Sequence, residues 1–385
     1  MKNVCAASLD EHHRPCSGCG ICAAVCPVKA IKMHFDRDGF YVPRVDESTC
    51  LACGRCCTVC QRLKEPSSEA LYQQSSVRVY SMKAQDANLL RSVSSGGVAA
   101  LLAQDAVRSK MSVVGCAYDA QNDQCYHTVA NTQKELQAFY GSKYLQSETQ
   151  GAFSQTLSTV PRAGGMVFGT PCQISGLDQA LRMYGIRENF TLVEVFCKGI
   201  SSRLLWSSYL EGLHQCDGLG EIGAVNFRDK TKSWREFSLT VSDIKGKIHR
   251  GTVYQDFYLM FMVRSVVLRE SCYACPFRHH ESAADIRLGD FWGPRYYDDR
   301  AGVSLVVSFT PKGENALARI RSECHVEDIF NKEEVLISQR FDRLPVWKHR
   351  EMLLSDLRDG MTLKQANKKY KVTSISIKYQ KEKTD

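Results

Sequence analysis

The sequence lacks the features that mark several broad classes of protein. None of its apolar runs approaches the roughly 20 residues that a membrane-spanning helix needs. The first five residues do not begin an apolar signal segment, so we do not expect secretion by that route. The G-x-G-x-x-G fingerprint of Rossmann dinucleotide sites is absent, and so is the C-x3-C-x2-C triplet of radical enzymes. These absences disfavour the membrane, secreted and Rossmann-type classes.

Cysteine, in contrast, is abundant. The 385 residues include 18 cysteines. In a chain without a signal segment, so many thiols indicate metal ligation in a reducing compartment rather than disulfide bonds. We therefore expect a cytoplasmic location.

Eight of the cysteines form two runs near the N-terminus, each with the spacing C-x2-C-x2-C-x3-C. The second run begins 34 residues after the first, so the pair is an internal repeat. Bacterial ferredoxins hold two cubane iron–sulfur clusters with this spacing, and the fourth cysteine of each run ligates the other cluster. The predicted ligand sets are Cys16, Cys19, Cys22 with Cys60, and Cys50, Cys53, Cys56 with Cys26.

Zinc and disulfide bonds are the alternatives for these eight thiols. C-x2-C pairs do bind zinc, but a zinc site needs only four ligands, and tight triplets suit a cubane better. Cys57 is a ninth thiol in the second run and competes with Cys56 for the ligand role.

The net charge does not make the chain a nucleic-acid binder. The 50 basic and 42 acidic residues give +8, with the basic residues spread along the chain. A cubane with its four thiolates carries about −2, so three clusters would reduce the total to roughly +2. We expect neither a nucleic-acid partner nor a membrane span.

Composition and periodicity predict the fold class α+β/α/β, a small ferredoxin-like domain followed by a larger mixed α/β domain. Residues 1–65 form the two-cluster domain, in which Asp38-Gly39 is the turn of a hairpin, and 66–76 form a polar linker. Strands alternate with helices from Val77 onward, which is typical of an α/β core. The expected parts are 77–200, 201–350 and a helical, basic tail over 351–385, with residues from 368 solvated.

Four further cysteines lie outside the two runs in suggestive positions. Cys172 and Cys197 each follow an apolar strand, and carboxyl ends of parallel strands meet at one edge of a sheet. Cys272 and Cys275 would reach the same edge from the next part of the chain. By spacing alone, a third cubane, a zinc site and unrelated thiols all stay open. The other single cysteines, Cys116 and Cys125 among them, are expected to be buried small apolar residues.

Two loops have the character of anion or cofactor contacts. Ser94, Ser95, Gly96 and Gly97 precede a predicted helix, and small residues at a helix N-terminus permit close approach of a phosphate. Ordinary helix capping explains the same pattern. The second loop follows Gly141 and supplies a hydroxyl, a cation and an aromatic ring: Ser142, Lys143 and Tyr144.

Together with Asp285–Gly293, these segments occur in an order that resembles the coenzyme F420 hydrogenase/dehydrogenase beta-subunit family, in the form with an N-terminal ferredoxin domain. The resemblance covers about residues 1–345. It implies an FAD flavoprotein whose two loops contact the flavin. It also implies a third 4Fe–4S cluster held by Cys172, Cys197, Cys272 and Cys275.

The expected function is that of an iron–sulfur flavin-dependent oxidoreductase. It would pass single electrons from a ferredoxin or another redox partner through 4Fe–4S clusters to FAD, for two-electron reduction of a small-molecule substrate, or the reverse. The alternatives are a non-catalytic electron-relay subunit and an iron–sulfur redox sensor. The sequence identifies no catalytic acid and no substrate.

Overall fold

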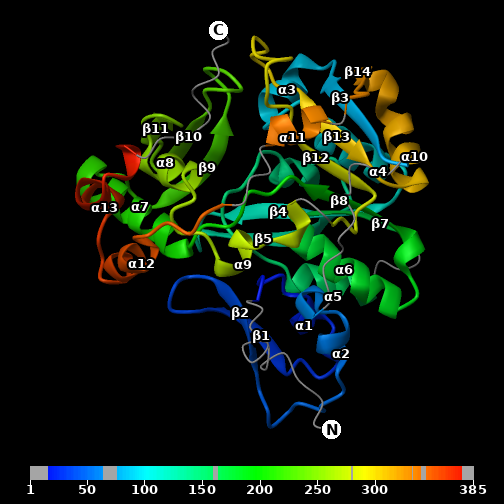
Figure 1. Ribbon diagram of the computed structural model, residues 1–385, viewed down its shortest axis with the longest axis horizontal. Helices are drawn as coiled ribbons and strands as arrows, with labels where there is room; N and C mark the ends of the chain where they lie inside the picture. Colours follow the sequence, from blue (N-terminus) through cyan, green and yellow to red (C-terminus); the bar gives the residue numbers. More distant parts are fainter. Residues whose placement is uncertain are drawn as a thin grey trace.

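The computed structural model describes residues 16–63, 76–158, 164–278, 281–331, 333–339 and 344–374. The linker predicted over 66–76 lies outside these residues except for its last position. Figure 1 shows a small domain at the bottom, a large sheet with its helices above it, and a lobe on the left. Within the described residues, no helix combines the length and the apolar character of a membrane span.

A nine-stranded mixed sheet forms the centre of the large domain. Four central strands run parallel to one another, and antiparallel strands extend the sheet on both sides. In spatial order the strands are β14 (Cys324–Asp328), β3 (Arg78–Ala84), β13 (Ser304–Ser308), β12 (Ile286–Asp290), β8 (Phe190–Val195), β7 (Gly165–Gly169), β4 (Ser112–Asp119), β5 (Gln124–Ala130) and β6 (Ser147–Glu148). Because strands such as β7 and β8 are buried on both faces, their sequences are continuously apolar rather than alternating.

Helices cover both faces of this sheet. On one face lie α3 (Ala87–Ser92), α4 (Val98–Arg108) and α10 (Pro311–Ile320), over side chains such as Met166 and Val193. On the other face lie α5 (Gln150–Ser158) and α6 (Pro171–Met183), over the alternate positions Val167 and Leu192. The short helix α11 (Glu333–Gln339) closes a smaller apolar cluster beside β3 and β13. The core therefore lies on both sides of the sheet, as an α/β fold requires.

The left-hand lobe is built on a three-stranded antiparallel sheet with its own apolar core. Its strands are β9 (Ile222–Asp229), β10 (Ser238–Asp243) and β11 (Ile248–Thr252). Its helices are α7 (Arg203–Asp217), α8 (Phe257–Val263), α12 (Arg350–Arg358) and α13 (Leu363–Tyr370). The short α9 (Glu270–Tyr273) leads from this lobe back to the large sheet.

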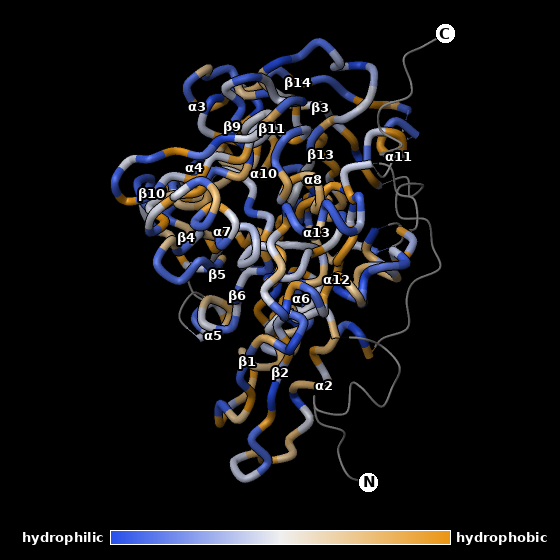
Figure 2. The backbone as a smooth tube through the Cα atoms, turned by 90° about the vertical axis from the view of Figure 1, so that its left-hand side faces the viewer, coloured by the Kyte–Doolittle hydropathy of each residue, from blue (hydrophilic) through white to orange (hydrophobic). Residues whose placement is uncertain are grey.

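The small domain carries two short helices and one hairpin. The elements are α1 (Ile21–Ala24), β1 (Ile31–Phe35), β2 (Tyr41–Val45), α2 (Arg55–Thr58) and the 3-10 turn η2 (Gln61–Leu63). The predicted hairpin is confirmed, with Gly39 at a φ of 76° in the turn. Ile21, Val25 and Val59 are buried in the cluster beneath α6, so this domain shares the core of its neighbour. Figure 2 shows it projecting below the rest of the molecule.

The solvated tail predicted from residue 368 is wrong at Val372, which is buried in the lobe core after α13. Leu353, Leu354 and Leu357 of α12, which precede that tail, are buried in the same core. The apolar face of α12 therefore anchors the segment despite its basic composition. Residues 375–385 lie outside the described residues. The mixed α/β fold with a ferredoxin-like N-terminal domain is otherwise as expected, and the exact domain division stays a prediction.

Candidate functional site

The first cysteine run and the end of the second surround one hollow. Its empty space, part of which is open to solvent, is about 400 Å³, and its lining includes the predicted set Cys16, Cys19, Cys22 and Cys60. The run can curl in this way because Gly20, before α1, adopts a φ of 75°, which other residues reach only with strain. The hollow is thus placed where the spacing predicts one cubane.

The second cysteine run surrounds a second hollow of about 430 Å³. Its lining includes Cys50, Cys53, Cys56 and Cys26, the other predicted set. Gly54 repeats the left-handed turn before α2, with a φ of 74°. Cys56 lines both hollows, whereas Cys57 lines only the first. The crossover of Cys26 and Cys60 therefore follows from the fold, and Cys56 fits the second set better than Cys57 does.

Backbone amides point at several of these sulfur atoms. The amide of Gly18 donates to Sγ of Cys16, and the amide of Ala30 donates to Sγ of Cys26, both at 3.2 Å. Amides of residues after Cys19 and Cys60 act in the same way. Such donors favour the thiolate form and tune the potential of a bound cluster.

Burial alone would keep these sulfurs protonated. It raises the pKa of Cys19 to about 12 and raises the pKa of Cys22 and Cys60 as well. A positively charged core is therefore needed to hold them as thiolates. Among the residues that the structure describes, no three His, Cys, Asp or Glu side chains converge as ligands of one ion would. Sulfurs arranged around a hollow suit a cluster better than a single zinc ion, whose bonds to sulfur are about 2.3 Å.

The four remaining candidate cysteines gather at the carboxyl edge of the large sheet. Cys172 lies in the first turn of α6 after β7, and Cys197 follows β8. Cys272 lies in α9, and Cys275 follows α9. Negative charge on Cys197 and Cys275 raises the pKa of Cys172, and charge on Cys272 and Cys275 raises that of Cys197. The sequence-predicted set is therefore brought together in space.

Two features hold this group in place. Gly199 lies so close to α9 that an added Cβ would stand 3.2 Å from Cβ of Cys272. The Arg278 guanidinium donates to the carbonyls of Lys198 and Cys272 at 2.8 Å. Burial raises the pKa of Cys197 and Cys272, and the charge of Arg278 opposes that rise. Amides at Gly199, Ile200 and Phe277 favour the thiolates of Cys197, Cys272 and Cys275 respectively. Four thiols with these backbone donors are a set that could hold a cubane, and a third cluster here stays a prediction.

The small domain meets this group through α6. The Thr149 hydroxyl donates to the carbonyl of Cys19 at 2.8 Å, and Nε of Arg269 donates to the carbonyl of Cys16 at 2.7 Å. Charge on Cys19 is the largest of the thiol influences that raise the pKa of Cys172. The first hollow and the third cysteine group are therefore neighbours. Thr149 and Arg269 could not be recognised from local patterns.

The two loops predicted to contact a flavin lie together at the same edge of the sheet. The amide of Ser142 donates to Oγ of Ser94 at 2.6 Å. A Cβ at Gly96 would stand 2.5 Å from the carbonyl oxygen of Met82, and Gly97 has a φ of 86° before α4. The two glycines are thus required by chain packing, and any ligand contact is a second role for them.

Lys143 and Tyr144 point into the protein from the second loop. The Lys143 ammonium donates to the carbonyls of Ala138 and Tyr140 at 2.9 Å. The Tyr144 hydroxyl accepts from the Arg228 guanidinium at 3.2 Å, and burial raises its pKa.

A polar cluster at the end of β12 was missed at the level of sequence. Arg228 forms an ion pair with Asp290 at 2.8 Å, and Nε1 of Trp234 donates to Asp290 at 2.6 Å. Trp234 stacks on Trp292 with ring centroids 4.7 Å apart. The nearby Lys230 ammonium donates to the carbonyls of Ser95 and Ala301, and burial lowers its pKa to about 8. Of the residues in this cluster, only Asp290 and Trp292 lie in a segment singled out from the sequence, Asp285–Gly293.

Comparisons with known proteins fit this geometry. Residues 165–331 match the family model for the C terminus of the coenzyme F420 hydrogenase/dehydrogenase beta subunit, and residues 15–62 match a 4Fe–4S dicluster domain. The family resemblance seen in the sequence is therefore confirmed, and the chain is an iron–sulfur redox protein related to the F420 hydrogenase beta subunit.

One similar solved structure is a chain of the F420-reducing NiFe hydrogenase complex from Methanosarcina barkeri, determined as a xenon derivative. It is 16% identical, with a TM-score of 0.47, and the match covers 80% of this chain and 97% of that one. No curated protein matches the chain.

Proposed function

We propose that this beta-subunit homologue is an iron–sulfur flavoprotein oxidoreductase. Single electrons would enter from a ferredoxin-type partner and reach FAD by way of three 4Fe–4S clusters, for two-electron reduction of a small organic molecule, or the reverse. The observation that carries this proposal is spatial: Cys19 of the first hollow adjoins Cys172 of the third group, which lies at the same sheet edge as the joined loops of Ser94 and Ser142.

The order of the cysteine groups supports a relay. Cys56 lines both ferredoxin hollows, so these two sites are adjacent. The first hollow then adjoins the third group across α6. The proposed third cluster would be held by Cys172, Cys197, Cys272 and Cys275, and the two ferredoxin clusters by the sets described above.

The residues around the two loops suit a ligand with anionic groups and a flat ring. Lys230 donates only to the carbonyls of Ser95 and Ala301, and no carboxylate within the described residues pairs with it. Nε of Arg228 is buried without a hydrogen-bond partner in the described structure. At Gly141 an added Cβ would meet nothing within 4 Å, so space remains beside Ser142. Cations beside open space are suited to a diphosphate.

Bound there, FAD would exchange electrons singly with clusters and in pairs with an organic substrate. The chain's own residues would hold and orient the ligand and manage protons. Ser94, Ser95, Ser142 and Lys230 are the proposed ligand contacts, together with the backbone at Gly96 and Gly97. The Tyr144 hydroxyl accepts from Arg228 and so keeps its own proton available, which makes it the candidate proton donor.

An anaerobic count of iron, sulfide and flavin per chain tests the proposal. We expect about twelve irons and one FAD. Eight irons would rule out the third cluster, and absence of flavin after anaerobic purification would overturn the flavoprotein assignment. A fully loaded chain that reacts with no donor or acceptor alone, but does so within a complex, would make it a relay subunit.

A further inference from the structure

Arg269 connects the first cysteine loop with the third cysteine group. Its side chain lies on the first loop, where Nε donates to the carbonyl of Cys16 at 2.7 Å and Nη1 donates to Oε1 of Gln146 at 3.4 Å. Its backbone lies on the third group. The Arg269 amide donates to the carbonyl of Ile200 at 2.9 Å, and its carbonyl accepts from the amide of Cys272 at 3.0 Å. One residue is therefore fixed at both sites.

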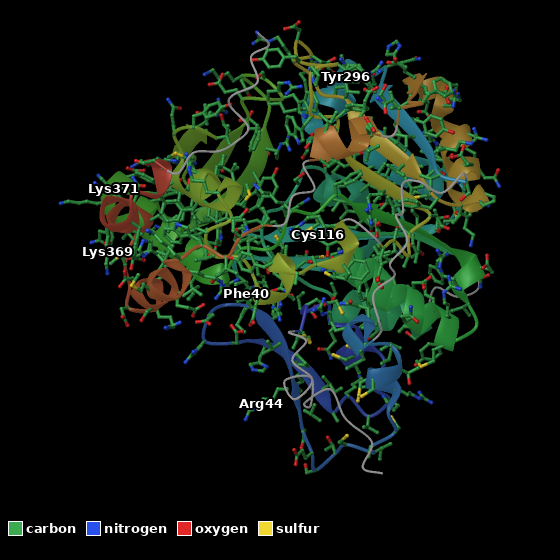
Figure 3. The ribbon with its side chains drawn as sticks, in the orientation of Figure 1. Phe40, Arg44, Cys116, Tyr296, Lys369 and Lys371 are labelled. Carbon is green, nitrogen blue, oxygen red and sulfur yellow. The ribbon has the colours of Figure 1, made fainter. Side chains whose placement is uncertain are left out.

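The guanidinium of Arg269 is closely surrounded. An added Cβ at Gly18, between the first two cysteines of the run, would stand 3.0 Å from Nη1 of Arg269. The guanidinium also lies over the ring of Phe40, 5.6 Å from its centroid. Figure 3 shows Phe40 at the end of the small domain that faces the rest of the molecule, with Arg44 farther down the same domain. The cation is thus held where the small domain meets the rest of the chain.

This cation is buried without a carboxylate beside it. Arg269 is 5% exposed, and within the described residues its guanidinium forms hydrogen bonds but no ion pair with Asp or Glu. A buried charge is costly unless an opposite charge balances it. The charge of Arg269 acts on Cys272, where it opposes the rise in pKa that burial causes. Thiolates of the first loop and of the third group are therefore the anions that would balance this guanidinium.

We propose that Arg269 is an electrostatic bridge between the first and third cysteine groups, which raises the reduction potential at both. The inference rests on the proposed function, which places a cubane at each of these sites. A cubane with four thiolates carries about −2, and reduction by one electron makes this about −3 with no bond formed or broken. A cation between two such sites stabilises the added electron on either of them. Arg269 would therefore raise the two potentials together.

Arg203 provides a matched control, because its guanidinium also joins the small domain to the rest of the molecule. It lies over the ring of Phe35 at 5.0 Å from the centroid, and it donates to the carbonyls of Asn122 and Asp123 at 3.0 and 2.9 Å. These contacts lie at the hairpin and involve no cysteine of the three groups. Arg203→Gln thus removes a charge and a domain contact away from the cysteines, so a purely structural effect would appear in this variant as well.

Redox titration of the anaerobic full-length protein, followed by low-temperature EPR, tests the proposal after an iron count. Cys53→Ser and Cys272→Ser identify the signals of the second and third sites. Arg269→Gln should lower the reduction equilibrium constant of the first site about tenfold, which corresponds to about 59 mV for one electron. The potential of the third site should fall in the same direction. Arg269→Lys, which keeps the charge, and Arg203→Gln should both leave these potentials unchanged.

A comparison within the wild type needs no variant at Arg269. Burial disfavours the more negative, reduced form of a cluster. By burial alone, the first site, whose Cys22 is buried, would therefore have a lower potential than the second site, whose Cys53 is exposed. With the charge of Arg269 beside it, the first site should have a potential equal to or above that of the second.

Two results would overturn the bridge while leaving the proposed function in place. The first is an Arg269→Gln variant with wild-type iron content and unshifted potentials. The second is a wild type in which the first site titrates more than about 59 mV below the second, a tenfold difference that would decide the question even if Arg269→Gln bound no iron. A wild type with about eight irons would instead overturn the third cluster and the bridge together.

Discussion

At Gly176, an added Cβ would stand 3.2 Å from Sγ of Cys19 and 2.9 Å from Cγ2 of Ile21. Helix α6 therefore touches the first cysteine loop at a position where only hydrogen fits. Cys172 lies one helical turn earlier on the same helix. Together with the hydrogen bonds of Thr149 and Arg269, this contact limits how closely the first hollow approaches the third cysteine group.

Gly176→Ala should therefore loosen the docking of the small domain. The extra methyl overpacks the contact, which costs about 1 to 3 kcal/mol and outweighs the roughly 1 kcal/mol that alanine gains inside a helix. Chemical unfolding of the anaerobic protein measures the change. Gly151→Ala in α5 is the matched control, because a Cβ there meets nothing within 4 Å. Equal stability of the two variants would contradict the contact.

The choice between Cys56 and Cys57 has a direct test. Cys56→Ser should remove one cluster, about four irons per chain, because Cys56 lines the second hollow together with Cys50 and Cys53. Cys57→Ser should keep its iron, since Cys57 lines only the hollow that already has four other candidate ligands. Iron analysis and low-temperature EPR of the reduced proteins check both. Iron loss in Cys57→Ser alone would reverse the assignment.

The third cluster makes a separate prediction. Cys272→Ser should lower the iron content by about four atoms while the ferredoxin pair remains. The control is Cys324→Ser, which changes a buried single thiol. Cys324 lies in β14, the edge strand of the large sheet, whereas the third cysteine group lies beyond the inner strands β7 and β8. If both variants carry the same iron content as wild type, Cys272 is not a ligand.

Flavin affinity should depend on pH through Lys230. Burial and the charge of Arg228 lower the Lys230 pKa to about 8, so in the free protein its ammonium is complete only below that pH. A bound diphosphate would raise this pKa, because it favours the charged form. Affinity should therefore be constant below about pH 8 and fall up to tenfold per pH unit above it.

Titration of the protein with FAD, followed by flavin fluorescence between pH 6 and 10, measures this dependence. Lys230→Arg should bind without the alkaline fall, and Lys230→Met should bind weakly at every pH. A wild-type affinity that stays flat to pH 10 would show that Lys230 does not contact the diphosphate.

Local spacing made the dicluster domain predictable, because three cysteines of each run lie within one loop of the chain. The assignment of the ligands to two sets stays a prediction. Cys172 and Cys197 could be assigned to one sheet edge, since each follows a strand and strand ends in a parallel sheet converge. The apolar strand before Cys172 and the helix after Gly97 were likewise expected, and they are β7 and α4 in the structure.

Contacts that form only when distant segments pack together cannot be predicted from local sequence. Arg228 and Asp290 are 62 residues apart, and no local pattern around either residue predicts their ion pair. The placement of Cys116 and Cys125 on the same face of the sheet depends on the register of β4 and β5, which the sequence does not specify. The basic composition of the last 18 residues suggested a solvated tail, but composition does not reveal that Val372 completes a distant core.

The second ferredoxin hollow has an exposed rim, where Leu51 is 64% exposed and Cys53 is also open to solvent. This rim lies on the small domain, which projects from the rest of the molecule (Figure 2). The third cysteine group lies elsewhere, at the edge of the large sheet where β7, β8 and β12 end. Under the proposed function, a one-electron donor would dock at this tip without touching a ligand at the sheet edge. Donor and substrate would then exchange electrons at separate surfaces, with the whole small domain between them.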